Sequence, residues 1–213
     1  MSAQPDAVEI RVVGCLLEKQ RTTPEAYPLS VNALRLACNQ ATNRDPVVDY
    51  DEPTVVAALE RLHRRGWTRM ASGAGSRARK YRHLFDRALE LGEPELAVMC
   101  VLMLRGPQTP GELKQRAERL HPFTDLAGVE AVLDGLIGRE LAVRLERRPG
   151  QKEQRYAQLF DDDADGGGEV SPGPAPQARV TAGPLTEERL ARLERELAEL
   201  RSEVRVLKAQ LGR

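Results

Sequence analysis

The most constraining feature of this chain is an internal repeat. Residues 75–86 read GSRARKYRHLFD and residues 150–161 read GQKEQRYAQLFD, so the second stretch repeats the first one 75 residues later. Five positions are identical, and Lys80 of the first stretch matches Arg155 of the second. Similarity at a fixed spacing indicates that one structural unit occurs twice. We therefore expect two copies of a small fold up to about residue 161.

Each copy of the repeat follows the pattern of an amphipathic helix. Apolar residues recur at i, i+3, i+4 and i+7, the spacing of one buried helix face; they are Val55, Ala58, Leu59 and Leu62 in the first half, and Val129, Val132, Leu133 and Leu136 in the second. Asp51 and Asp125 precede these patterns and can cap the helices. Two earlier helices are expected in each half. The second of them should begin at Thr23-Pro24 or Thr109-Pro110, because Thr caps helices and Pro suits their first turn.

Short alternating runs follow the third helix pattern in each half. They cover residues 67–71 and 141–145, and a glycine-containing turn joins each of them to a second run, which ends at Phe85 or Phe160. This pattern is typical of a β-hairpin. Three helices followed by a hairpin is the element order of a winged helix. We therefore predict a mainly α-helical α+β fold with two tandem winged-helix domains, at residues 1–90 and 91–161. Two unrelated helical hairpins that happen to look alike are the alternative.

The composition changes after the second copy. Residues 162–185 are rich in Asp, Gly and Pro, a composition that cannot bury a core, so they are predicted to form a disordered linker. Across residues 186–212, apolar residues alternate by three and four positions, as in a coiled coil; they are Leu190, Leu193, Leu197, Leu200, Val204, Leu207 and Leu211. We predict that this coiled coil makes the protein a homodimer. A single amphipathic helix is the alternative.

Four segments resemble those of a known family. They are CLLEKQRTTPEAYPLSVNALRLACNQATNRDPVVDYDEPTV (15–55), GSRARKYRH (75–83), LRGPQTPGELKQRAERLHPF (104–123) and RRPGQKEQRYAQLF (147–160). Together they closely resemble the bacterial YceH family over about residues 8–160, with several long motifs in the same order. The resemblance implies a tandem winged-helix protein, often with a C-terminal coiled coil. It implies no particular biochemical activity.

Motifs of enzymatic or metal chemistry are missing from the sequence. The three histidines, His63, His83 and His121, show no metal-ligand spacing such as HExxH. There is no P-loop, dinucleotide-binding glycine motif or nucleophile elbow. We therefore expect no metal, no cofactor and a binding protein rather than an enzyme.

The cysteines, the N-terminal residues and the apolar runs indicate the cellular compartment. Cys15, Cys38 and Cys100 stand far apart and are odd in number, which favours free, buried thiols in a reducing compartment. The N-terminal residues have neither the basic nor the apolar region of a signal peptide. No apolar run approaches the length of a membrane span. We therefore expect a cytoplasmic protein without membrane contact.

Basic residues are distributed unequally between the two halves. Between Thr54 and His83 one acidic residue, Glu60, stands against eight basic ones, namely Arg61, Arg64, Arg65, Arg69, Arg77, Arg79, Lys80 and Arg82. In the corresponding residues 128–158, six basic residues stand against five acidic ones. Only the first copy is therefore charged for a phosphate backbone. The third helix of the second copy instead carries Gly135 and Gly138 on its exposed side, where small residues predict close packing of another element.

The eight basic residues support two interpretations. In a winged helix the third helix enters the major groove and the wing lies over phosphates, so we predict a dimeric regulator that binds double-stranded DNA. The acidic cluster of Asp49, Asp51 and Glu52 at the start of the third helix favours the alternative, a protein-interaction adaptor whose winged helices bind partner proteins. Nearby amides such as Asn39 and Asn43 can read adenine edges or satisfy backbone groups in a turn. We favour the turn.

Overall fold

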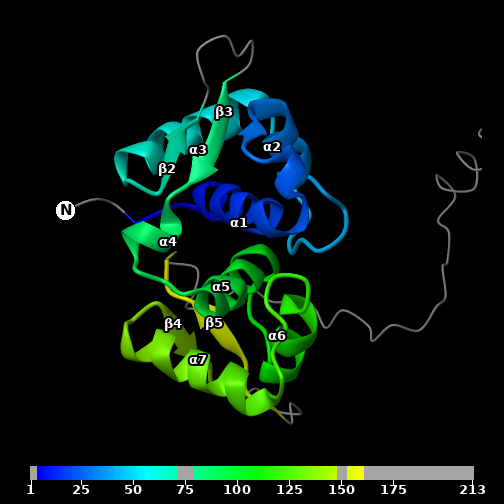
Figure 1. The fold of residues 1–213 in the computed structure, drawn as a ribbon, viewed down its shortest axis with the longest axis vertical. Helices are drawn as coiled ribbons and strands as arrows, with labels where there is room; N and C mark the ends of the chain where they lie inside the picture. Colours follow the sequence, from blue (N-terminus) through cyan, green and yellow to red (C-terminus); the bar gives the residue numbers. More distant parts are fainter. Residues whose placement is uncertain (1–3, 72–78, 148–152, 161–213) are drawn as a thin grey trace, which may run out of the picture. The chain divides into compact units, whose positions relative to one another are not determined.

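The computed structural model describes residues 4–71, 79–147 and 153–160. The elements of the first half are α1 (Ala7–Thr22), the 3₁₀ turn η1 (Pro24–Ala26), β1 (Leu29–Ser30), α2 (Val31–Cys38), α3 (Glu52–Arg64), β2 (Thr68–Met70), β3 (Lys80–His83) and α4 (Phe85–Ala88) (Figure 1). Those of the second half are α5 (Glu93–Arg105), α6 (Pro110–Ala117), α7 (Leu126–Gly138), β4 (Ala142–Arg144) and β5 (Tyr156–Gln158). Arg77, the predicted linker and the predicted coiled coil lie outside the described residues.

The element order confirms the predicted repeat and fold class. Helices α1, α2 and α3 correspond in order to α5, α6 and α7, and the hairpin β2–β3 corresponds to β4–β5. The structure is therefore mainly α-helical with small antiparallel β-sheets. Six of the eight predicted helix-face residues are fully buried. Of the other two, Leu59 is 2% exposed and Val132 is partly buried. The periodic apolar pattern thus identified the faces that α3 and α7 turn toward the core.

Side-chain caps fix where most helices begin. The carboxylates of Asp51 and Asp125 each accept a backbone N–H at 2.9 Å, from Thr54 and Gly128, so both predicted caps are confirmed. Thr109 and Glu112 form the predicted capping box at the start of α6. The prediction for Thr23-Pro24 is wrong. These residues begin only the three-residue turn η1, because α2 starts seven residues later, where Ser30 supplies the cap.

The two β-sheets differ in size. In the first half the strands are ordered β1-β3-β2, and Tyr81 of β3 pairs with Leu29 of β1. In the second half β4 pairs with β5, and Tyr156, the repeat counterpart of Tyr81, forms a single bridge to Gln108. The counterpart of β1 is therefore reduced to one residue. The hairpins nevertheless have the same register in both halves, so they can be compared residue by residue.

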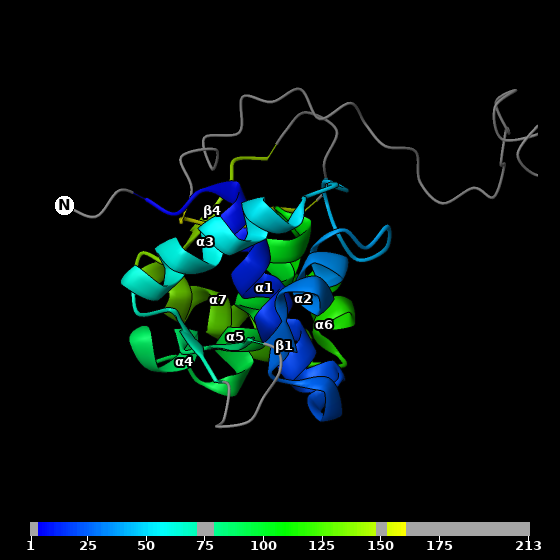
Figure 2. The ribbon, with the colours of Figure 1, turned by 90° about the horizontal axis from the view of Figure 1, so that it is seen from above.

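Helices α1 and α5 join the two halves in one core. They run side by side (Figures 1 and 2), and both are buried over most of their circumference. Each packs on its own half and on the other helix, which is why their apolar residues are not confined to one stripe. The Cys100 thiol donates to the Gly14 carbonyl oxygen at 3.4 Å across this contact. The hydrophobic core is thus continuous across the predicted domain boundary at residues 90–91.

Candidate nucleic-acid interface

The hairpin of the first half presents basic side chains on one face. In the antiparallel pairing of β2 with β3, Thr68 stands opposite His83 and Arg69 stands opposite Arg82. Thr68 and His83 are buried. Successive residues of a strand point to opposite faces, so Arg69 and Arg82 lie on the face turned away from the core. Lys80 is two residues from Arg82 and shares that face.

The pair Arg69–Arg82 has no acidic partner among the described residues. Arg69 is exposed, and the Nε atom of Arg82 is buried without a hydrogen-bond partner within the described ranges. Like charges directly opposite each other in a β-ladder are destabilising. An anion placed over this face would offset that repulsion. We call the face formed by Arg69, Lys80 and Arg82 the basic hairpin face.

The arginines at the end of α3 are placed differently from one another. Arg61 donates to Asp6 Oδ2 at 2.6 Å and to Glu9 Oε2 at 3.1 Å, and Arg65 donates to Glu9 Oε1 at 3.0 Å. Both therefore neutralise the N-terminal end of α1. Arg64 is exposed, and no hydrogen bond or ion pair joins its side chain to another described residue. Its contact with DNA stays a prediction, while the contacts of Arg61 and Arg65 indicate a structural role.

Glu9 is the buried centre of that ion-pair cluster. Its side chain is only 2% exposed. Burial raises the pKa of Glu9, but hydrogen bonds from Arg65, the Asp6 backbone and Arg61 outweigh burial and hold the pKa below its usual value. The carboxylate is therefore charged at neutral pH and depends on its arginines. A buried charge that loses its partners is costly, so these contacts stabilise the packing of α3 on α1.

The rest of α3 offers little for reading bases. Its exposed residues include Ala57 and Glu60, neither of which is a cation, and Glu52 lies exposed at the N-terminal end. Just before the helix, the Asn39 amide donates to the Tyr50 carbonyl at 2.8 Å and accepts the Tyr50 N–H at 2.9 Å. Asn39 thus closes the loop between α2 and α3, and the turn interpretation is confirmed for this residue.

The second half has the same hairpin without the opposed arginine pair. At the register of Arg69 and Arg82 it carries Val143 opposite Ala157. Two of its arginines form ion pairs: Arg144 lies 3.4 Å from Asp134, and Arg155 lies 3.1 Å from Glu112. The guanidinium of Arg144 also lies 5.5 Å from the centre of the Tyr156 ring. The charge difference seen in the sequence thus becomes a difference in neutralisation.

Several other predictions can be compared with the structure. Gly135 and Gly138 are exposed, and no described side chain lies within 4 Å of a Cβ added to either, so the predicted packing on this face of α7 is wrong within the described part of the chain. Cys15, Cys38 and Cys100 are free and buried, as predicted. Asp6 and Glu9 were not among the residues predicted from the sequence. Their Asp-x-x-Glu spacing, the signature of a capping box, was the available signal.

No helix in the described segments combines the length and apolar character needed to cross a membrane. Likewise, in residues 4–71, 79–147 and 153–160, no three His, Cys, Asp or Glu side chains gather in a way that could hold a metal ion.

Comparison with known proteins gives a consistent family. Residues 6–151 match the family described as "Protein of unknown function, DUF480". A UPF0502 protein of Pelobacter propionicus is 52% identical over 204 residues, which cover 94% of this chain and 91% of the relative. A UPF0502 protein of Klebsiella pneumoniae (strain 342) is 52% identical over 172 residues, covering 78% and 79%. Since the family match spans more than half of the chain and the relatives align over most of their length, the chain belongs to the DUF480 family.

Proposed function

We propose that this protein is a tandem winged-helix protein of the YceH type that binds double-stranded DNA through its first half. The basic hairpin face acts as the wing and lies over the phosphate backbone, together with Arg64 and Arg79. Residues 186–212 hold two chains together, and the dimer acts in the cytoplasm as a regulator of transcription rather than as an enzyme. The element order of both halves and the resemblance described above support this assignment.

One observation carries the proposal. The same hairpin occurs twice, and only the first copy has two opposed arginines without an acidic partner among the described residues. Arginine binds phosphate oxygens with two parallel N–H donors, which makes it well suited to a nucleic-acid backbone. In a protein whose net charge is zero, a local excess of this kind is better explained by a ligand than by solubility alone.

The mode of binding follows from the side chains on α3. Ala57 and Glu60 on its exposed face form no bidentate contact to a base of the kind that arginine makes with guanine. Phosphate contacts fix the position of a protein on DNA but carry no sequence information. We therefore expect binding that depends strongly on salt and weakly on sequence, with Arg61 and Arg65 serving the fold.

Fluorescence anisotropy with a labelled duplex of about 20 base pairs tests the proposal on the full chain. Arg69→Gln/Arg82→Gln should weaken binding and reduce the slope of log K against log salt by about 0.9 for each lost phosphate contact. Arg87→Gln, a change of an exposed arginine on α4, is the control and should leave the slope unchanged. No binding by the parent protein at low salt, or an equal loss in the control, would contradict the proposal.

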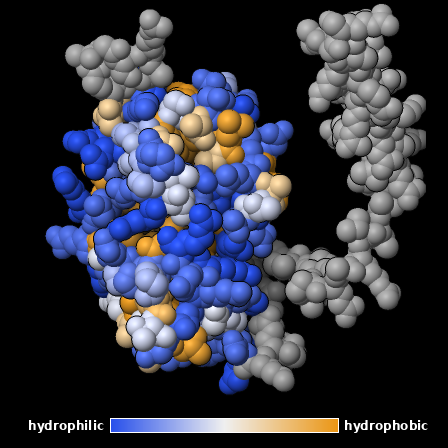
Figure 3. Space-filling model, turned by 45° about the vertical axis from the view of Figure 1, so that its right-hand side comes forward, coloured by the Kyte–Doolittle hydropathy of each residue, from blue (hydrophilic) through white to orange (hydrophobic). Residues whose placement is uncertain are grey.

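A second candidate is the adaptor that binds partner proteins. Leu36 on α2 and Val47 in the following loop are 55% and 60% exposed, which gives the first half apolar side chains at its surface. The face drawn in Figure 3 is largely hydrophilic with small separate hydrophobic groups, so it offers no broad apolar patch of the size that marks interfaces. Leu36→Ser with unchanged DNA binding but loss of a nuclease-resistant protein partner would favour the adaptor.

A further inference from the structure

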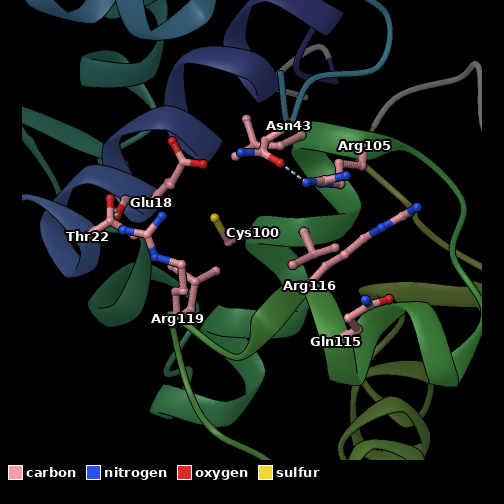
Figure 4. A pocket seen from close by; sticks show the side chains of 11 residues that line it. Glu18, Thr22, Asn43, Cys100, Arg105, Gln115, Arg116 and Arg119 are labelled. Carbon is pink, nitrogen blue, oxygen red and sulfur yellow. Dashed lines mark hydrogen bonds between the residues drawn. The ribbon is translucent and has the colours of Figure 1, made fainter. Parts of the chain in front are cut away.

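A cavity lies where the two halves meet. It has a volume of about 450 Å³ and is bordered by α1, the loop after α2, α5 and α6 (Figure 4). Ligand-binding pockets of proteins commonly have volumes of about 300 to 1,000 Å³. The cavity is separate from the basic hairpin face, because it draws its side chains from other elements. Its size alone is sufficient for a small organic molecule.

Three arginines of the second half line the cavity. Arg105 and Arg116 lie on one side and Arg119 lies on the other, with Cys100 between them (Figure 4). Arg105 donates to the Asn43 side chain, which is uncharged. Arg116 forms an ion pair with Glu112 at 3.4 Å, and Glu112 also forms an ion pair with Arg155. Arg119 is exposed and has no ion pair with another described residue.

The proximity of these cations affects Arg105. Burial lowers the pKa of Arg105, and the nearby charges of Arg116 and Arg44 lower it further, while those of Glu18 and Asp45 only partly oppose them. The guanidinium still carries its charge at neutral pH, because arginine is effectively always protonated in proteins. An anion close to Arg105 would therefore be attracted by several positive charges at once, in a place where water screens them less than at an open surface.

The acid that lines the cavity does not cancel this charge. Glu18 accepts hydrogen bonds from Arg44 at 2.6 Å and 3.0 Å, and Lys19 lies 3.2 Å away. Burial raises the pKa of Glu18, but the hydrogen bonds and charge of Arg44 outweigh it and hold the pKa below its usual value. Glu18 is thus ionised and already neutralised by two cations that are not among the three arginines.

The floor of the cavity is apolar. Cys100 and Leu104 of α5 are almost fully buried, and Leu120 adds a partly buried side chain from the end of α6. Burial raises the pKa of the Cys100 thiol, so this side chain is uncharged. An apolar floor between positively charged walls suits a ligand that has an apolar body as well as an acidic group.

We propose that this cavity binds a small organic anion, a carboxylate or a phosphate ester with an apolar body, through Arg105 and Arg119. The ligand contacts α1 of the first half and α5 and α6 of the second half at the same time. The site is distinct from the proposed DNA contact and does not depend on it.

Isothermal titration calorimetry on the full chain, in a buffer without phosphate, tests this site with phenyl phosphate as the probe. Inorganic phosphate carries the charge without the apolar body, and phenol carries the apolar body without the charge. Phenyl phosphate should bind at least about tenfold more tightly than either, since both parts of the cavity contribute. Benzoate distinguishes a preference for carboxylate from one for phosphate, and binding of either aromatic anion supports the site.

Matched variants locate the binding. Arg119→Gln changes an exposed side chain and should fold normally, as circular dichroism would verify. This variant and Arg105→Gln should each bind phenyl phosphate about tenfold more weakly than the parent protein. Arg69→Gln/Arg82→Gln should bind the probe as the parent does. Three outcomes would overturn the proposal: neither phenyl phosphate nor benzoate binding more tightly than inorganic phosphate, full binding by the Arg119 variant, or loss of binding in the hairpin variant instead.

Discussion

Phe85 and Phe160, which occupy the same position in the two copies of the repeat, pack against each other edge to face with ring centroids 5.6 Å apart. Trp67 completes the cluster, at 4.9 Å from Phe85 and 5.3 Å from Phe160. Equivalent residues of the two halves thus contact each other directly. Together with the packing of α1 on α5, this contact indicates that the halves unfold as one cooperative unit.

Substituting Phe85 tests that cooperativity. Phe85 is fully buried, so Phe85→Ala should lower the free energy of unfolding by about 3 to 5 kcal/mol. Trp67 is the only tryptophan, so its fluorescence reports the cluster, while circular dichroism reports the helices of both halves. The two signals should change together in urea. Leu159→Ala, at a position that is 37% exposed, should cost far less. Separate transitions for the two signals would show that the halves are independent.

Two glycine substitutions, one expected to lower stability and one expected to raise it, test the contact between α1 and α5. A Cβ on Gly14 would lie 2.9 Å from Leu104 Cδ2 and 3.2 Å from Met103 Cβ. Gly14→Ala should therefore destabilise the protein by about 1 to 3 kcal/mol, although alanine favours helices. Gly135→Ala on α7 meets no described atom within 4 Å and should stabilise by up to about 1 kcal/mol. Thermal melts of both variants give the comparison, and a stabilised Gly14 variant would contradict the close packing.

The arginines of α3 should separate into structural and surface classes. Arg61→Gln removes two ion-pair contacts from the cluster around the buried Glu9, and it should lower stability by about 1 to 3 kcal/mol. Arg64→Gln changes a neighbouring exposed residue and should alter stability by less than about 0.5 kcal/mol. Urea unfolding at neutral pH measures both. Equal stability of the two variants would remove the structural role assigned to Arg61.

His83 should make stability depend on pH. It is buried beside Gln20. Burial is the main reason that its pKa falls to about 4; the charge of Asp86 raises the pKa, and the charges of Arg82 and Arg21 lower it. The unfolded chain binds a proton near pH 6.5, whereas the folded chain does so only near pH 4. The stabilisation is therefore complete above pH 6.5 and is lost as the pH falls toward 4, at up to about 1.4 kcal/mol per pH unit.

Replacement of the histidine tests this pH dependence. His83→Gln should be less stable at pH 7. It should also flatten the plot of unfolding free energy against pH between pH 6.5 and pH 4.5, a range in which carboxylates contribute less to the pH dependence. His63→Gln, on the exposed side of α3, should keep the slope of the parent protein. Urea unfolding at a series of pH values gives the curves. An unchanged slope in the His83 variant would assign the acid sensitivity to other groups.

The sequence predicted the features that depend on neighbours along the chain. Caps such as Asp51 act on a residue three positions away, and the apolar stripe of α3 repeats every turn, so both are visible in one short window. The ion pair of Arg61 with Glu9 joins residues 52 positions apart, and no local pattern specifies it. The arginine cavity likewise needs side chains from both halves. The charge count over residues 54–83 was therefore correct as a sum but could not say which arginines, such as Arg61 and Arg65, are already neutralised.

The C-terminal heptads give the last prediction, which rests on sequence because residues 186–212 lie outside the described residues. With Leu190 at an a position, the g residues are Arg189, Glu196 and Glu203, and the e residues that face them in a parallel dimer are Glu194, Arg201 and Lys208. All three pairs have opposite charge, so a parallel, in-register homodimer is favoured. Exposed pairs contribute only about 0.2 to 1 kcal/mol each, so they select the register while the leucines supply the stability.

Sedimentation velocity on the full chain can test this dimer. Leu200→Lys places a charge at a buried d position and should convert the protein to a monomer, because an unpaired charge in the seam is far more costly than the surface pairs are favourable. Ser202→Lys adds the same charge at an f position, which faces solvent in a coiled coil, and should leave the dimer intact. A monomeric parent protein at micromolar concentration would contradict the coiled coil. So would a dimer that persists in the Leu200 variant, since association would then have to come from the two halves of the repeat.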